Sequence, residues 1–93
     1  EPGTALHKAT CYPNPFSERT TVQFLLACRT PVKLEIYDSF GNRIAARDEG
    51  MTDAGTRKVT IDGNKLPAGL LLCRIVAGGS VQYLKLVHQG AAQ

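Results

Sequence analysis

The sequence predicts an all-β fold, an antiparallel β-sandwich, and three observations support that prediction. Segments of strand character recur at short intervals along the 93 residues, with turn residues between them, as is typical of sandwiches. In the stretch PVKLEIYD the alternation predicts that Val32, Leu34 and Ile36 face a core while Lys33 and Glu35 face water. The apolar run LLLCRIV lies between glycines and a proline, which confine it to the length of a strand.

Seven strands are expected from these patterns, each bounded by residues that favour turns. The run LLLCRIV is apolar at nearly every position, so we expect a central strand that is covered on both faces and lies in the middle of the core. The expected strands lie at residues 5 to 11, 20 to 28, 31 to 38, 42 to 47, 56 to 61, 69 to 77 and 81 to 88.

The turns between these strands have recognisable chemistry. The segment Asp38-Ser39-Phe40-Gly41-Asn42 places a glycine where a short hairpin loop needs a positive φ, and Gly78-Gly79 suits a two-residue hairpin turn. Asp62-Gly63-Asn64 supplies a further turn, and Asp53-Ala54-Gly55 breaks the chain before the fifth strand. Two hairpins are therefore predicted, one at each of the first two segments.

The segment Tyr12-Pro13-Asn14-Pro15-Phe16 is stiff because each proline fixes its own φ and favours extended geometry in the residue before it. It is expected to form a rigid corner between the first and second strands. Tyr12 and Phe16 are then placed to close the end of the sandwich with their rings.

The composition, with 43% hydrophobic and 20% charged residues, is typical of a globular protein. A length of 93 residues is too short for more than one domain, so residues 1 to 93 are expected to form one small domain. The net charge of +3 is scattered without a basic stripe, which argues against nucleic-acid binding. No apolar run approaches the length that crosses a bilayer, and Glu1-Pro2-Gly3 has no signal-peptide character. The chain is therefore expected to be either cytosolic or a piece of a longer exported protein.

Residues for nucleophilic catalysis are poorly represented. The two histidines, His7 and His88, lie near the two ends of the chain and are expected on the surface or on edge strands. Cys11, Cys28 and Cys73 each lie in an apolar stretch and are expected to be buried free thiols, although one disulfide of unspecified pairing remains an alternative. The sequence therefore predicts no enzyme and no catalytic residue.

Metal and phosphate sites are likewise not predicted, and neither is a cofactor or a small-molecule substrate. The cysteines are too widely spaced for a zinc site. Asp48, Glu49 and Asp53 lack the regular alternation of a calcium-binding loop and are expected in a solvated turn-rich segment. Ala77-Gly78-Gly79-Ser80 lacks the spacing and the following helix of a phosphate loop.

Five short motifs, in order, resemble the C-terminal sorting domain of the bacterial type IX secretion system, a relative of the Ig-like domain of flagellar hook-capping proteins. Each motif is weak alone, but their order and spacing make a fairly specific signal. They are the Pro-Asn-Pro segment at residues 12–16, a strand at 21–26, the hairpin at 32–38 and 41–44, the Leu-x-x-Gly lead at 66–69, and the terminal strand at 85–87.

This resemblance implies an Ig-like sandwich that acts as a non-catalytic address. The domain would follow an N-terminal cargo and direct it from the periplasm across the outer membrane to the cell surface or the medium. The implied partners are the outer-membrane translocon and a sortase-like cysteine peptidase, which often removes the domain. The residues implied for sorting or recognition are Pro13, Asn14, Pro15, Phe16, Gly41, Gly69, Lys85, Leu86 and Val87.

The last strand is the expected docking element, because an edge strand offers unpaired backbone groups to a partner. If Leu84 and Leu86 face the core, Lys85 faces solvent, either for a partner or as an edge-protecting charge. Two other classes of function remain: an Ig-like adhesive, carbohydrate-binding or spacer module of a surface protein, and a hook-cap-like assembly module. The absence of tryptophan disfavours a sugar-binding platform.

Overall fold

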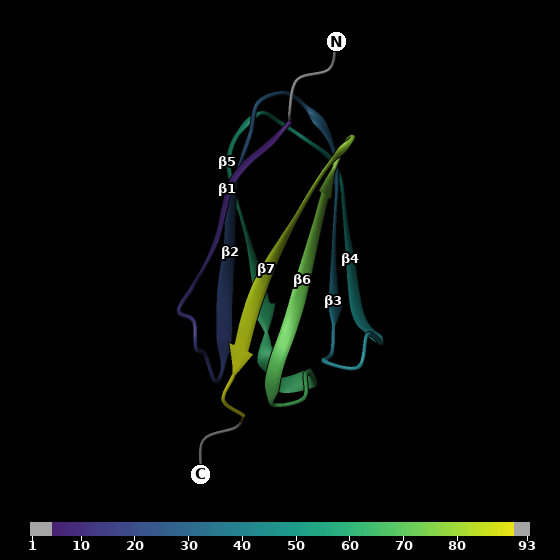
Figure 1. Cartoon of the computed structure of the whole chain (residues 1–93). Helices are drawn as coiled ribbons and strands as arrows, with labels where there is room; N and C mark the ends of the chain where they lie inside the picture. The colour runs from purple at the N-terminus through teal and green to yellow at the C-terminus, as the bar shows by residue number, and fades with distance from the viewer. Residues whose placement is uncertain (1–4, 91–93) are drawn as a thin grey trace.

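The computed structural model describes residues 5 to 90, which form seven strands and one short 3-10 helix (Figure 1). The expectation drawn from Glu1-Pro2-Gly3 therefore concerns residues outside the described range. The elements are β1 (Leu6–Tyr12), β2 (Arg19–Leu26), β3 (Thr30–Tyr37), β4 (Arg43–Thr52), β5 (Gly55–Asp62), η1 (Gly63–Lys65), β6 (Gly69–Ala77) and β7 (Ser80–His88).

The strands form two antiparallel sheets. One sheet has the order β1-β2-β5 and the other has the order β4-β3-β6-β7. The chain makes hairpins between β3 and β4 and between β6 and β7, and it crosses between the sheets after β2, β4 and β5. The predicted Ig-like antiparallel sandwich of about seven strands is confirmed.

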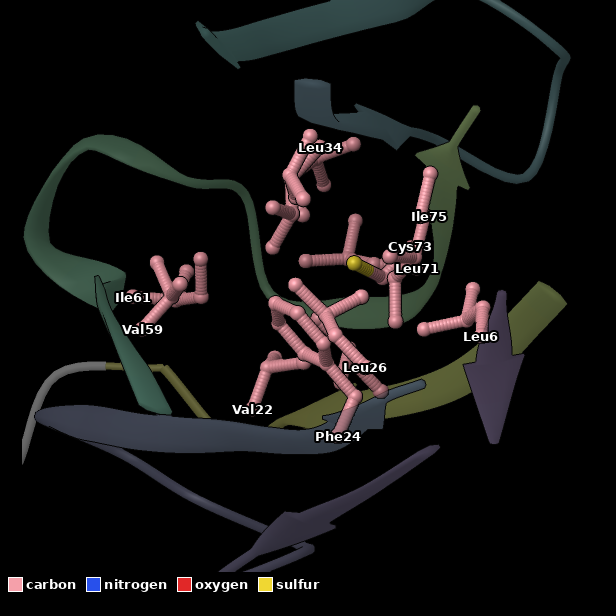
Figure 2. Packing of buried hydrophobic residues seen from close by; sticks show 14 of the residues in the cluster. Leu6, Val22, Phe24, Leu26, Leu34, Val59, Ile61, Leu71, Cys73 and Ile75 are labelled. Atoms are coloured by element: carbon pink, nitrogen blue, oxygen red, sulfur yellow. The ribbon is translucent and has the colours of Figure 1, made fainter. Parts of the chain in front are cut away.

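The core lies between the sheets and is built from alternate residues of their strands (Figure 2). Val32, Leu34 and Ile36 are buried, as the alternation in PVKLEIYD predicted. Because both sheets use one face in this way, a chain of this size can enclose a continuous apolar interior. The buried cluster comprises Leu6, Phe16, Val22, Phe24, Leu26, Val32, Leu34, Ile36, Val59, Ile61, Leu71, Cys73, Ile75, Ala77 and Leu86.

The run LLLCRIV forms the central strand β6, between β3 and β7, but it is covered on only one face. Leu71, Cys73 and Ile75 are buried, whereas Leu70 retains 53% of its exposure and Leu72 is half-buried. The expectation of cover on both faces was wrong because a two-layered sandwich has no third layer to lie against its outer face.

Glu35 is also buried, at 6% exposure, although its position in the alternation places it on the outer face. Two arginines and a tyrosine on neighbouring positions cover it: Arg74 Nη1 donates to Oε1 over 2.7 Å, Arg43 Nη1 to Oε2 over 3.0 Å, and the Tyr37 hydroxyl to Oε1 over 3.2 Å. The prediction that Glu35 faces water was therefore wrong, because paired charges can be covered on an outer face.

Strand β4 is longer than the predicted segment 42 to 47 and includes residues that were expected in a turn. Lys33 is paired with Asp48 and Val32 with Gly50, so Glu49 is an extra residue in a β-bulge. Most of β4 is exposed because it is the outer strand of its sheet. An exposed edge strand tolerates charges that resemble a loop in the sequence, which explains the misplaced Asp48 and Glu49.

Both predicted hairpin turns are present. The Asp38 carboxylate accepts hydrogen bonds from the backbone N–H groups of Phe40 and Asn42, and Gly41 has a φ of 88°. The turn between β6 and β7 contains Gly78 and Gly79. The turn predicted after β5 forms the short helix η1. In the described part of the chain, no helix has the length and hydropathy needed to span a bilayer.

Candidate functional site

The proline corner lies beside the end of the last strand. The connection between β1 and β2, the helix η1 and the C-terminal end of β7 gather at one end of the sandwich (Figure 1). Four of the predicted recognition residues, Pro13 to Phe16, therefore lie near three others, Lys85 to Val87, although about 70 positions separate them in the sequence.

Asn14 joins the corner to β7 through both ends of its side-chain amide. Its Nδ2 donates to the carbonyl oxygen of Lys85 over 2.8 Å, and its Oδ1 accepts from the N–H of Val87 over 2.8 Å. The carbonyl oxygen of Lys85 and the N–H of Val87 flank Leu86, and a neighbouring strand would supply one donor and one acceptor to such a pair of groups. Asn14 thus acts as a one-residue substitute for a strand at the edge of the sheet.

Phe16 continues the pairing that Asn14 begins. The N–H of Phe16 donates to the carbonyl oxygen of Val87 over 2.9 Å, and the N–H of Gln89 donates to the carbonyl oxygen of Phe16 over 2.7 Å. β7 is an edge strand of its sheet, as expected, but its outer edge from Lys85 to Gln89 is occupied by the corner. The expectation that this edge is free to pair with a partner does not hold for that part of the strand.

Phe16 and His88 close this end of the core together. Phe16 is 2% exposed and stacks on the His88 ring with 4.8 Å between ring centroids. The two ring nitrogens of His88 lie 3.0 Å from the carbonyl oxygen of Pro67 and 2.9 Å from that of Ser17. The expectation of a surface or edge-strand position holds for His88 only in its second form, because His88 ends the edge strand β7 but its side chain is buried on the same face of β7 as Leu86.

Gly63 makes room for this stacked pair. A Cβ at Gly63 would come within 2.6 Å of His88 Nε2 and 3.0 Å of the Phe16 ring. Such distances are too short for non-bonded atoms, so a side chain at position 63 would displace the rings. The glycine of the predicted turn thus has a packing role that the sequence did not indicate.

The rest of the corner is bonded to the buried side chain of Thr20 and is otherwise exposed. Thr20, fully buried, donates its hydroxyl hydrogen to the carbonyl oxygen of Pro13 over 2.8 Å. Pro13 and Pro15 are exposed, and each follows a cis peptide bond. Tyr12 is 44% exposed, and its hydroxyl donates to Gln23 Oε1. Of the two rings expected to close the end of the sandwich, Phe16 does so and Tyr12 does not.

The other predicted recognition residues have different surroundings. Lys85 and Val87 are exposed, whereas Leu86 between them is fully buried. Gly69 begins β6 with a φ of 115° and is paired with His88, so it lies beside the stacked rings of Phe16 and His88. Gly41 lies in the turn between β3 and β4 and takes part in none of the contacts of the proline corner that are described above. Their roles in recognition stay predictions.

Two further contacts fasten the first half of β7 to β1, and sequence reasoning missed them. Gln82 Nε2 donates to the carbonyl oxygen of Leu6 over 3.1 Å, and the N–H of Ala5 donates to the Ser80 hydroxyl over 2.9 Å. Gln82 and His88 occupy the core-facing positions of β7 that alternate with exposed ones. A polar residue at a core-facing position was the signal that could have revealed both contacts.

The thiols and acidic groups form no reactive cluster in the described part of the chain. Cys73 is buried, and burial raises its pKa to about 12. Cys11 is half-buried with a pKa raised by burial, while Cys28 is exposed, contrary to the expectation of a buried thiol. All three are free thiols. Among residues 5 to 90, no group of three or more potential ligands is placed to hold a metal ion.

Comparison with known proteins gives one informative match. No curated protein matches the sequence. One solved structure, of a protein provisionally described as a beta-galactosidase from Bacteroides fragilis, is 17% identical with a TM-score of 0.36, over 89% of this chain and 16% of that one. That likeness is too distant to carry an argument. The family model described as the secretion system C-terminal sorting domain matches residues 10–89. The chain therefore belongs to the family of secretion system C-terminal sorting domains, the sorting signals of type IX secretion.

Proposed function

We propose that this domain is a non-catalytic C-terminal address for type IX secretion. It follows a cargo in a larger exported protein. The cargo passes through the periplasm and crosses the outer membrane through the translocon, after which a sortase-like peptidase removes the domain. Membership in the family supports export toward the cell surface or the medium, because the family consists of sorting signals.

The observation that carries this proposal is the clasp between the proline corner and β7. Asn14 and Phe16 together make four hydrogen bonds to the segment Lys85–Gln89. The two segments that the family resemblance singles out at opposite ends of the chain thus form one structural unit. A partner that binds this unit therefore contacts segments from both ends of the chain, which come together only when the domain has folded.

Within this unit we assign different roles to exposed and buried residues. Lys85, Val87, Pro13 and Pro15 are exposed and contact the export machinery. Phe16 and Leu86, which are buried, and Asn14 and Gly69, which are exposed but bonded to or paired with β7, hold that surface in shape. Because the backbone edge beside Lys85 is occupied, recognition proceeds through side chains rather than through an added strand.

The ends of the domain suit this arrangement. β1 begins at the end of the sandwich opposite the corner, whereas β7 finishes beside the corner (Figure 1). The domain is 49 Å along its longest axis. A cargo joined ahead of β1 is therefore held away from the clasp. Even a large cargo leaves the recognition surface accessible.

The direct test is to fuse residues 1 to 93 to a periplasmic reporter in a type IX-competent bacterium. The reporter should reach the surface or the medium, and deletion of residues 81 to 93 should retain it in the periplasm. Lys85→Glu should reduce export, whereas Lys58→Glu, on an exposed strand of the other sheet, is the matched control. A full-length fusion that remains periplasmic would reject the proposal.

A second variant tests whether the side-chain amide of Asn14 holds the corner against β7. Asn14→Ala removes both amide hydrogen bonds, and we expect a loss of roughly 1–3 kcal/mol in the free energy of unfolding. Urea denaturation measures this loss, and hydrogen exchange at the Val87 amide should accelerate. If Asn14→Ala left both quantities unchanged, the clasp would not hold the corner in place.

A further inference from the structure

The outer face of the four-stranded sheet carries a cluster of apolar and aromatic side chains. The register places Leu70 beside Val87, Leu72 between Tyr37 and Lys85, and Arg74 beside Tyr83. Leu70, Tyr83 and Val87 retain 53%, 58% and 39% of their exposure. The apolar outer face is defined here as Tyr37, Leu70, Leu72, Arg74, Tyr83 and Val87.

Part of this face is hollowed into a groove. Leu70, Leu72, Arg74, Tyr83 and Lys85 line it on β6 and β7, and the end of β3 with the following turn forms its other wall. A concave apolar surface can enclose the side chains of a partner, which a flat surface cannot do.

The polar residues of the face are held rigid. Glu35 fixes the guanidinium groups of Arg74 and Arg43, and these ion pairs hold the pKa of Glu35 below its usual value. Tyrosine and arginine are the residues most enriched where protein interfaces derive their affinity. Because Arg74 is already oriented, a partner would lose less conformational freedom when it binds.

The other sheet shows what a merely solvated face looks like in this protein. Its outward positions on β2 and β5 are polar or charged, with Leu25 as the exception. The polar outer face is defined here as Thr21, Gln23, Thr56, Lys58 and Thr60. The fold therefore does not require an apolar outer face, since the same sandwich tolerates a polar one.

We propose that the apolar outer face is a docking surface for an extended, acidic segment of a partner protein in which apolar side chains alternate with carboxylates. The apolar side chains enter the groove between Tyr37 and Tyr83. The carboxylates pair with the cations around it. This surface borders the clasp, since Lys85 lines the groove and Val87 belongs to the face, but the proposal does not depend on the proposed sorting function.

The charge of the face selects this occupant. Its cations outnumber its carboxylates, and one carboxylate, that of Glu35, is already shared by two arginines. The cations are Lys33, Arg43, Arg74 and Lys85, and the carboxylates are those of Glu35, of Asp48 opposite Lys33, and of Asp38 in the wall of the groove. An acidic segment therefore complements the face electrostatically. A second copy of the chain docking through the same face would bring two cationic surfaces together, which disfavours a symmetric dimer.

The test is an NMR titration of the 93-residue chain with three capped hexapeptides. One alternates aspartate and leucine, one alternates lysine and leucine, and one alternates aspartate and serine. Only the aspartate–leucine peptide should shift the amide resonances of residues 70 to 74 and 83 to 85. The dissociation constant should rise at least about ten-fold in the variant Leu72→Thr.

The matched control is Leu25→Thr, the same change at an outward position on β2, and it should leave the dissociation constant unchanged. Equal shifts with the lysine–leucine peptide, shifts confined to other strands, or no shift would overturn the proposal. Self-association by sedimentation, or binding to phosphatidylglycerol vesicles through the same face in preference to the peptide, would also overturn it. The titration uses no secretion machinery, so its failure leaves the export result of the reporter fusion unaffected.

Discussion

The two outer faces of the sandwich cover the same core but differ in kind. The polar outer face carries mostly hydroxyl, amide and ammonium groups, whereas the apolar outer face presents leucines, tyrosines and an arginine. Both sheets bury alternate residues of their inner strands, such as Val22 and Phe24 on β2 and Leu71 and Cys73 on β6. The difference therefore arises at outward-facing positions, which the packing of the core does not constrain. At such positions the sequence can reflect a requirement for binding.

In the core beneath the two faces, the difference between the sheets should disappear. Substitutions there should have the largest effect on the free energy of unfolding. Phe24 lies under the polar outer face and Leu71 under the apolar outer face, and both are almost fully buried. Phe24→Ala should cost about 3–5 kcal/mol and Leu71→Ala about 2–5 kcal/mol, through lost burial and a residual cavity. Urea unfolding measures both, and a cost below about 1 kcal/mol for either would show unequal packing.

Acid should weaken the ion pairs that cover Glu35 on the outer side of the four-stranded sheet and thereby lower the stability of the fold. The Arg74 and Arg43 guanidinium groups lower the pKa of Glu35 from its ordinary value of 4.5. The unfolded chain then binds more protons than the folded one at acidic pH. This stabilisation is complete above about pH 4.5 and is lost as the pH falls through the folded-state pKa.

The measurement for this prediction is the urea midpoint as a function of pH. Glu35→Gln should lower the midpoint at neutral pH and flatten its decline in acid. Hydrogen bonds from Asn42 lower the pKa of Asp38 as well, so the double variant with Asp38→Asn should be flatter still. Parallel curves for the parent chain and Glu35→Gln would mean that the ion pairs contribute nothing to folding.

The smallest effect is expected for the outward leucines themselves. Leu72→Thr and Leu25→Thr should each change the free energy of unfolding by about 1 kcal/mol or less, because both are half-buried on outer faces. Chemical denaturation of the two variants side by side is the measurement. If Leu72→Thr cost as much as Leu71→Ala, the apolar outer face would be needed for folding and its contrast with the other face would have a structural cause.

Local patterns predicted the strands well and their surroundings less well. The alternation at Val32, Leu34 and Ile36 gave the inner face of β3 correctly, because period two is set by the backbone itself. It could not show that Glu35, on the outer face, would be covered by Arg74, which is 39 positions away. The apolar run around Leu72 indicated a buried strand because composition alone does not distinguish a covered face from one reserved for a partner.

The candidate site was predicted as two separate segments, and their contact was not foreseen. The stiffness of the segment around Asn14 follows from its prolines, and that much was readable from the sequence. The contact with Lys85 and Val87 depends on how the sheets stack, which local sequence does not encode. His88 could have been found, since alternation from Leu86 places it on the core-facing side of β7.

The amide of Asn14 also has a consequence for crowded conditions. Exposed strand edges are templates on which identical chains stack into fibres. A side chain that fills the hydrogen-bonding groups of Lys85 and Val87 leaves no ladder there for a second chain to extend. Many copies can therefore accumulate in a narrow compartment without seeding polymerisation from the end of the last strand.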